Sequence, residues 1–263
     1  SCLTPPAAAL RPLDGAAFGP HFVRFGANLF AQNVAGQPVQ LNESTTPFGA
    51  ITRPWVEPPR VVGKLLIRAE ENGRIIAQHP SSLNEAIWHW QASWPTSLTG
   101  ELCKLKTKDN TLLAAVPYNE GNDWVRLDTE RGQLLWRVPA RKLPDGLDPE
   151  TVCLGNTSWY YAKGNAVCAR SLNDGTLQWT RSLPATTGGW RIRYARDYLA
   201  VYPLKCQKEQ AFFVSFLDPI EGTLLQRLSF PESATPGKVV LTPRNVLVSA
   251  AGRIFNFRSL DAE

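Results

Sequence analysis

The residues best suited to chemistry are thinly spread along this sequence. Its five cysteines show no CxxC spacing, which argues against a zinc ribbon and against a thioredoxin-type redox motif. Its three histidines, His21, His79 and His89, lie too far apart to predict a metal triad. No GxSxG elbow, P-loop or GxGxxG motif is present. The sequence therefore predicts no catalytic residue, no cofactor site and no metal site.

The cysteines and the acidic residues have structural interpretations. Most cysteines are expected to be buried thiols, with a disulfide through Cys103 or Cys206 as the alternative. The full set is Cys2, Cys103, Cys153, Cys168 and Cys206. An odd number leaves at least one thiol unpaired within the chain. Asp128, Asp174 and Asp218 fall at expected turns, where such side chains usually accept hydrogen bonds from nearby backbone.

One phrase recurs along the chain. It reads Leu127-Asp128 followed by Gly132-Gln-Leu-Leu-Trp136, then Leu172-Asn-Asp with Gly175-Thr-Leu-Gln-Trp179, and later Leu217-Asp218 with Gly222-Thr-Leu-Leu-Gln226. Weaker copies end at Trp90, with Ala86 in place of the glycine, and at Gln40, with Gly36 at the turn. The turn positions are 43 to 50 residues apart. A recurrence of this length is typical of four-stranded antiparallel units that bury their faces by stacking around an axis.

Inside each unit the sequence alternates as strands do, with many β-branched and aromatic residues. One unit predicts strands at 150–156, 159–163, 166–171 and 176–183, and the next at 190–196, 198–203, 211–217 and 223–230. The last unit predicts only three, at 238–241, 246–250 and 254–260.

The recurring positions of the phrase suit the packing of one blade on the next. Each glycine provides a residue that accepts positive φ at a tight turn. Trp136 and Trp179 lie two positions beyond Leu134 and Leu177, which predicts the same face of the sheet and an indole that fills the gap between blades. The predicted docking residues are Trp90, Gly132, Trp136, Gly175, Trp179 and Gly222.

The phrase Leu-Asn-Asp-Gly-Thr-Leu-Gln-Trp179 resembles the tryptophan-docking repeat of the quinoprotein, or PQQ-like, β-propellers. The resemblance covers residues 20–263 and implies an all-β propeller of four-stranded antiparallel blades. That superfamily includes quinoprotein alcohol dehydrogenases and cofactor-free BamB-type propellers. A dehydrogenase of this kind is expected to have adjacent cysteines and a calcium site, and this sequence has no Cys-Cys pair. The matching residues are packing residues, so they predict fold rather than function.

The expected organisation is an irregular N-terminal arm over residues 1–19 and one propeller over residues 20–263. About six blades are expected, the last of them lacking its outer strand. The N-terminal arm or a partner could supply that strand and remove an exposed edge. Alternatively, the remaining blades belong to another segment of a longer chain.

Composition favours an exported protein of periplasmic type, with a cytoplasmic location as the alternative. No apolar run approaches the length of a membrane span. The sequence has no Met and starts Ser-Cys, so we expect that the natural N-terminus has been removed, either by processing or by the choice of the expressed segment. Cys2 is a candidate lipid anchor and the only expected contact with a membrane.

Two surfaces are candidates for partner binding, and a protein partner is expected. Formal net charge is +5, with Lys104, Lys106 and Lys108 alternating on one expected strand and Arg191, Arg193 and Arg196 on another. These residues either attract an acidic partner or form a solvated edge that discourages strand pairing. The loop 45–59 presents Phe48 and Trp55, and a second long loop spans 139–149; either anchors a partner or folds back over a blade. No aromatic platform accompanies the basic residues, so nucleic acid is not expected.

The favoured function is a noncatalytic scaffold or protein-interaction propeller in an exported or envelope-associated assembly. One alternative is a partial or degenerate quinoprotein dehydrogenase whose active-site residues lie elsewhere. The other is a sensor or signalling propeller of a larger cytoplasmic protein.

Overall fold

The computed structural model is all-β, with a few short 3-10 turns. It describes residues 22–25, 28–32, 38–40, 59–70, 73–79, 82–94, 103–118, 121–144, 147–184, 189–195, 197–204, 212–230, 239–241, 245–250 and 253–258. The chain divides into two compact units, residues 1–135 and 136–263. Within the described residues, no helix combines the length and the apolar character needed to cross a bilayer.

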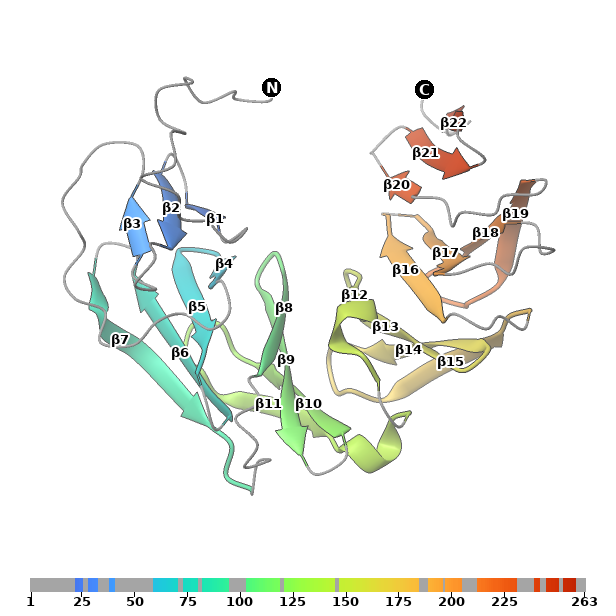
Figure 1. Ribbon diagram of the computed structural model, residues 1–263. Coiled ribbons are helices and arrows are strands. Elements are labelled where there is room, and N and C mark those ends of the chain that lie inside the picture. Colours follow the sequence, from blue (N-terminus) through green and yellow to red (C-terminus); the bar gives the residue numbers. More distant parts are fainter. Residues whose placement is uncertain are drawn as a thin grey trace, which may run out of the picture. The chain divides into compact units, whose positions relative to one another are not determined.

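The sheets of the first unit are antiparallel meanders in which consecutive strands are neighbours (Figure 1). The first sheet has three strands, β1 (Phe22–Phe25), β2 (Asn28–Gln32) and β3 (Pro38–Gln40). The second has four, β4 (Arg60–Val62), β5 (Leu65–Ala69), β6 (Arg74–His79) and β7 (Ser82–Gln91). The third is built from β8 (Lys104–Lys108), β9 (Thr111–Tyr118), β10 (Gly121–Leu127) and β11 (Leu134–Val138), whose end belongs to the second unit.

The second unit repeats the same plan. One sheet contains β12 (Cys153–Leu154), β13 (Ser158–Lys163), β14 (Ala166–Ser171) and β15 (Leu177–Ser182). The next contains β16 (Trp190–Tyr194), β17 (Leu199–Pro203), β18 (Phe212–Leu217) and β19 (Leu224–Phe230). The last sheet has three strands, β20 (Val239–Leu241), β21 (Asn245–Ala250) and β22 (Arg253–Arg258).

In the second unit the middle strand β17 is buried on both faces because its sheet packs against the sheets on either side. In β17, Leu199 and Val201 lie in a cluster with the β12–β15 sheet, whereas Ala200 and Tyr202 lie in a cluster with β20–β22. All five residues of β17 are buried, which explains its continuous apolar sequence. The fourth strands β15 and β19 are instead mostly exposed.

The predicted strands agree with the structure except at residues 150–156. There the chain first makes a 3-10 turn, η4 (Pro149–Thr151), and the strand β12 is only two residues long. Asp148 caps the turn by accepting a hydrogen bond from the amide of Glu150, and Pro149 begins it. The loop 139–149 also contains η3 (Ala140–Lys142). Of its described residues, Leu143 and Leu147 are buried.

Candidate functional site

The repeated turns share one hydrogen-bonded geometry. In each, the amide of the glycine donates to a carbonyl four residues earlier: Gly132 to Asp128, Gly175 to Ser171 and Gly222 to Asp218. The amide of that earlier residue donates to the carbonyl after the glycine. All three glycines have φ between +69° and +73° (69, 73 and 70), in the left-handed region that favours glycine.

Acidic side chains stabilise these turns, as the sequence predicted. The Asp128 carboxylate accepts from the amides of Glu130 and Arg131 at 3.0 and 2.7 Å. Asp218 makes the same pair of contacts with the amides of residues 220 and 221 at 2.7 and 2.8 Å. Asp174 accepts from the amide of Thr176 at 3.0 Å, and this contact lowers the pKa of the Asp174 carboxyl. These carboxylates are therefore occupied in holding backbone.

A tryptophan from the preceding sheet docks on each turn. The indole N–H of Trp136 donates to the Leu172 carbonyl at 2.7 Å, and that of Trp179 donates to the Pro219 carbonyl at 3.3 Å. Both acceptors directly follow the first residue of their turn. One hydrogen bond thus fixes the position of the indole along each turn.

The glycine of each turn lies under the indole face. A Cβ added at Gly222 would lie 2.6 Å from Trp179 Cδ2 and Cε3, and one at Gly175 would lie 3.0 Å from Trp136 Cε3. At Gly222 the indole would have to move to admit a Cβ, and at Gly175 both the indole and Val138 Cγ2, which would lie 2.8 Å from the Cβ, would have to give way. The turns therefore need glycine both for the backbone conformation and for the close approach of the indole.

In the first unit the docking indole belongs to Trp88, which corrects the prediction of Trp90. Trp88 Nε1 donates to the Thr129 carbonyl at 3.0 Å, and a Cβ at Gly132 would lie 2.5 Å from Trp88 Cε3. Trp90 lies two positions further along β7, in the core and edge-on to Trp94.

The physical reason for this error is the irregular pairing of β6 with β7. The register shifts twice there, so spacing counted from the turn does not apply. Trp88 lies opposite Ala77, just as Trp179 lies opposite Ala169. Ala86, expected at the turn, lies within β7 opposite Gln78.

A β-bulge also corrects the predicted facing of Trp179 and Leu177. Trp179 lies opposite Ala169 and Leu177 opposite Arg170, with a register shift between the two pairs. Ala169 and Arg170 are consecutive and point to opposite faces, so Leu177 and Trp179 do too. Leu177 is accordingly 52% exposed.

A buried guanidinium that the sequence analysis missed stabilises the turn of residues 171–175. Arg170 is 8% exposed and donates from Nε to the Tyr161 hydroxyl at 3.1 Å, from Nη1 to the Gly175 carbonyl at 2.8 Å and from Nη2 to the Lys142 carbonyl at 3.0 Å. Burial raises the pKa of Tyr161, so the hydroxyl stays neutral and accepts this bond. The residues at the corresponding position before the other two turns are Leu127 and Leu217, so the repeat pattern did not indicate an arginine at position 170.

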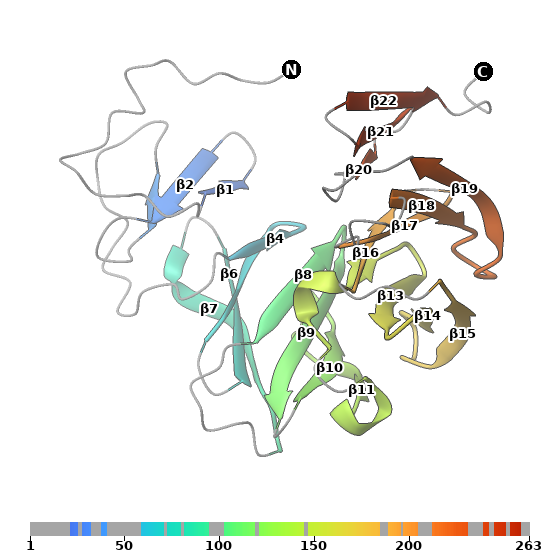
Figure 2. The same cartoon turned by 45° about the vertical axis from the view of Figure 1, so that its right-hand side comes forward.

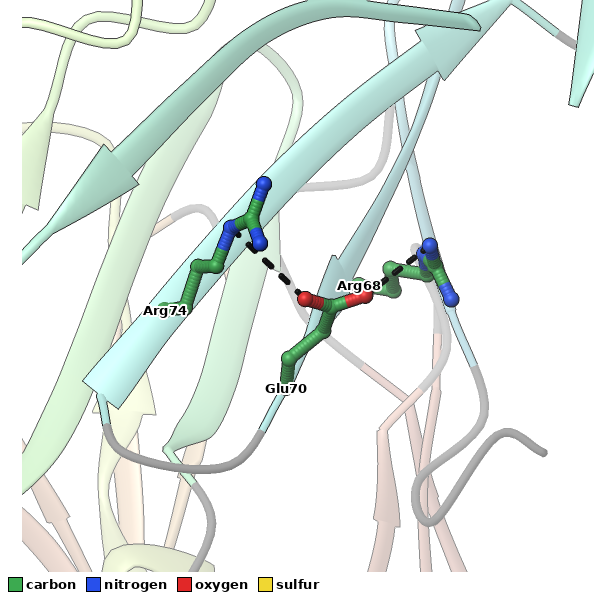
Figure 3. Close-up of polar contacts among 3 residues, drawn as sticks. All are labelled: Arg68, Glu70 and Arg74. Atoms are coloured by element: carbon green, nitrogen blue, oxygen red, sulfur yellow. Dashed lines mark ion pairs between the residues drawn. The ribbon is translucent and has the colours of Figure 1, made fainter. Parts of the chain in front are cut away.

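A partly buried ion-pair cluster in the first unit was also unpredicted. The Glu70 carboxylate lies between two guanidiniums, 2.9 Å from Arg68 Nη2 and 3.7 Å from Arg74 Nε (Figure 3). The Glu70 amide donates to the Arg74 carbonyl at 2.7 Å across the β5–β6 hairpin. The cluster adds ion pairs to this hairpin, in which Gly73 has a φ of +71°, as the glycines of the repeated turns do.

The candidate basic residues lie on first strands, at one edge of their sheets. Lys104, Lys106 and Lys108 are on β8 and half-buried. Arg191 and Arg193 are on β16 and exposed, with Trp190 and Ile192 buried between them. β8 and β16 hold equivalent places in their sheets, as predicted, and each set lies in its own unit.

Several predicted features lie outside the described residues. They are Phe48, Trp55 and the rest of the loop to residue 58, the arm 1–19 with Cys2, and also His21, Gly36, Arg196 and Cys206.

The predicted thiols and the remaining histidines have ordinary environments. Cys103 and Cys168 are buried free thiols and Cys153 is a half-buried one. Burial raises the pKa of Cys103 to about 12. His79 and His89 are exposed. Across the described ranges, no group of three or more His, Cys, Asp or Glu side chains is placed to hold a metal ion.

Comparisons with known proteins identify the fold. No protein-family model matches the sequence, and no curated protein matches it. BamB from Moraxella catarrhalis matches the structure with a TM-score of 0.56 and 12% identity, over 92% of this chain and 70% of that one. The computationally designed protein Ika8 matches with a TM-score of 0.55 and 10% identity, over 90% of this chain and 70% of that one. The predicted fold class, a β-propeller of four-stranded antiparallel sheets with a three-stranded last sheet, is confirmed.

Proposed function

We propose that the chain is a noncatalytic propeller of the PQQ-like repeat family that acts as a scaffold or protein-interaction module in an exported or envelope-associated assembly. The observation that carries the proposal is that the polar and reactive side chains of the repeat have structural roles. Asp128 and Asp218 hold turns, Trp88, Trp136 and Trp179 join sheets, and Cys103 and Cys168 are buried. Among the exposed side chains of the second unit are Arg191 and Arg193 of the strand β16.

The proposed contact surface is the exposed edge that carries Arg191 and Arg193. These side chains alternate with buried Trp190 and Ile192, so packing on one face of β16 holds both guanidiniums out on the other. Planar guanidinium groups on a rigid strand suit bidentate contacts with carboxylates. The expected partner is a protein with an acidic surface.

Charge reversal tests this surface. R191E/R193E is compared with K163E/R181E, which makes the same charge change at exposed positions of the neighbouring sheet. Each purified protein is used to capture partners from the envelope fraction of its native source. We expect R191E/R193E alone to lose the captured protein. Equal capture by both variants would refute the surface.

The loop that holds Phe48 and Trp55 is proposed as a second anchor because large aromatic residues often carry the energy of an interface. W55A in the same capture experiment is expected to weaken binding. Unchanged capture by W55A would leave β16 as the only proposed contact.

Export and a lipid anchor at Cys2 complete the proposal and are tested by fractionating cells that express the full-length gene. The protein is expected in the membrane fraction, and C2S is expected to move it to the periplasm. Recovery of both forms from the cytoplasm would favour the signalling alternative.

A further inference from the structure

Two strands of the second unit, β15 and β19, present most of their side chains to solvent. Five of the six residues of β15 and five of the seven residues of β19 are exposed. Each strand is the last of its sheet, and Figure 2 shows both on the same side of the unit. We call their exposed residues the outer-strand patch, which consists of Leu177, Gln178, Thr180, Arg181, Ser182, Leu224, Leu225, Gln226, Arg227 and Ser229.

The formal charges in this patch are all positive. Arg181 and Arg227 are its charged residues, and no described strand from β12 to β22 contains Asp or Glu. The acidic residues that precede the two strands most closely in sequence, Asp174 and Glu221, lie in turns. β7, which holds the same place in its own sheet, instead exposes Glu85. The patch is therefore suited to a negatively charged partner.

One of the two guanidiniums is held in place by its own sheet. Arg227 Nε donates to the Ser215 hydroxyl at 3.2 Å, and the guanidinium carbon lies 5.2 Å from the centroid of the Phe213 ring. Within the described residues no hydrogen bond involves its two Nη atoms. These donors are thus available to an anion such as a phosphate group, which a guanidinium binds through two parallel hydrogen bonds.

The patch also exposes large apolar side chains. Leu177 is 52% exposed, Leu225 is 56% exposed and Leu224 is 39% exposed. Ile220, in the turn that leads into β19, is 74% exposed. Groups of exposed apolar side chains mark contact sites for proteins or membranes. A partner that satisfies the whole patch therefore combines negative charge with an apolar interior.

We infer that the outer-strand patch docks on the surface of an anionic lipid bilayer. Such a surface offers phosphate groups to the guanidiniums and, just below them, an acyl region to the leucines. The formal net charge of +5 favours the approach of the whole chain to it. An acidic protein would satisfy the arginines alone, whereas a bilayer satisfies the arginines and the leucines together. The contact is separate from the acidic partner proposed for β16 and from the anchor proposed at Cys2.

The association is expected to be weak and reversible, because few side chains enter the bilayer. Each arginine near an anionic surface strengthens binding by about five-fold, so the two together contribute about thirty-fold. Salt screens this attraction, so binding should weaken as the ionic strength rises. A contact carried by the leucines alone would not weaken with salt.

Co-sedimentation of the full chain with lipid vesicles tests the inference. The C2S chain is used throughout, so that no attached lipid contributes. Vesicles of phosphatidylglycerol mixed with phosphatidylcholine should bind the protein, and vesicles of phosphatidylcholine alone should not. R181E/R227E should weaken binding by about thirty-fold or more. R191E/R193E makes the same charge change on β16 and should retain most of the binding.

A second pair of variants tests the apolar contact. L177S/L225S should weaken binding by about ten-fold, because each leucine loses the burial of its exposed half in the acyl region. V240S/I254S makes a similar change at exposed sites of the last sheet and should bind as the C2S chain does. Matching circular dichroism spectra and melting temperatures establish that the variants fold. If R181E/R227E does not fold, R181E is compared with R193E.

The absence of binding to anionic vesicles, or equal binding to both kinds of vesicle, would overturn the inference. A loss in R191E/R193E as large as that in R181E/R227E would also overturn it, because net charge alone would then explain the binding. Unchanged binding of L177S/L225S would do the same. Binding lost in R181E/R227E and weakened in L177S/L225S, but kept in both controls, would support it. None of these results bears on the capture experiment with R191E/R193E, so the two proposals can fail separately.

Discussion

The substitution Gly222→Ala should be far more damaging than Gly164→Ala, although both residues have positive φ. Gly222 has a φ of +70° and Gly164 a φ of +53°. A Cβ at Gly164 meets no atom within 4 Å, whereas at Gly222 it would lie 2.6 Å from two ring atoms of Trp179. The pair therefore separates the cost of the backbone conformation from the cost of displacing the docked indole.

The magnitudes follow from these two costs. Holding alanine in the left-handed region costs about 1–2 kcal/mol, which is the whole expected loss for G164A. Overpacking a rigid contact adds about 1–3 kcal/mol, so G222A should lower the free energy of unfolding by about 2–5 kcal/mol. In W179Q, which introduces the residue that β19 carries at position 226, the ring is absent and the second cost should vanish.

Urea unfolding of the four proteins G164A, G222A, W179Q and G222A/W179Q, followed by far-UV circular dichroism, measures these differences. The loss in the double variant should be smaller than the sum of the single losses by about 1–3 kcal/mol. Equal losses in G164A and G222A, or strictly additive losses in the double variant, would refute the account of docking.

Three further predictions follow from contacts described above. W88F leaves the Thr129 carbonyl without its indole donor and should lower the unfolding free energy by about 1–3 kcal/mol. In NMR spectra W88F should change the amide signals of the 128–132 turn, whereas the control W90F should leave them unchanged. Arg170→Met removes two buried hydrogen bonds and one partly buried one, and should cost about 2–4 kcal/mol in urea unfolding. An unchanged urea midpoint would contradict the role of Arg170. Burial raises the pKa of the Cys103 thiol from 9.0 to about 12. The protonated thiol therefore contributes its full stabilisation below pH 9, and this contribution is lost as the pH rises toward 12. Over that pH range the unfolding free energy of C103A should decline less steeply than that of the natural chain.

The sequence predicted most strands because the turns between them have local chemical causes. Gly132, Gly175 and Gly222 adopt positive φ, and Asp128 and Asp218 accept from the amides that follow. Both effects act within five residues of the chain, so they can be read from spacing.

The errors arose where pairing between strands decides the outcome. A bulge reverses which face a side chain occupies, and the one after Leu177 separates it from Trp179. On β7, Trp88 and Trp90 satisfy the same alternation, so only the paired strand distinguishes them. Arg170 donates hydrogen bonds to the nearby Gly175 carbonyl and to the Lys142 carbonyl, which lies 28 residues away, and no local pattern indicates the second contact. The predicted partner-binding residues depend on a partner, and the chain's own sequence carries little information about it.

Each docked tryptophan joins its own sheet to the next one along the chain. Each indole connects one sheet only to the next, so stability should be a sum of separate sheets and separate joints. Gln226 occupies the place of the indole on β19 and is exposed, which leaves the joint to β20–β22 without its ring. Amide hydrogens of that terminal sheet should therefore exchange first with solvent, and unfolding should begin there. A series linked in this way can lose or gain a sheet at its end while the interior joints stay unchanged.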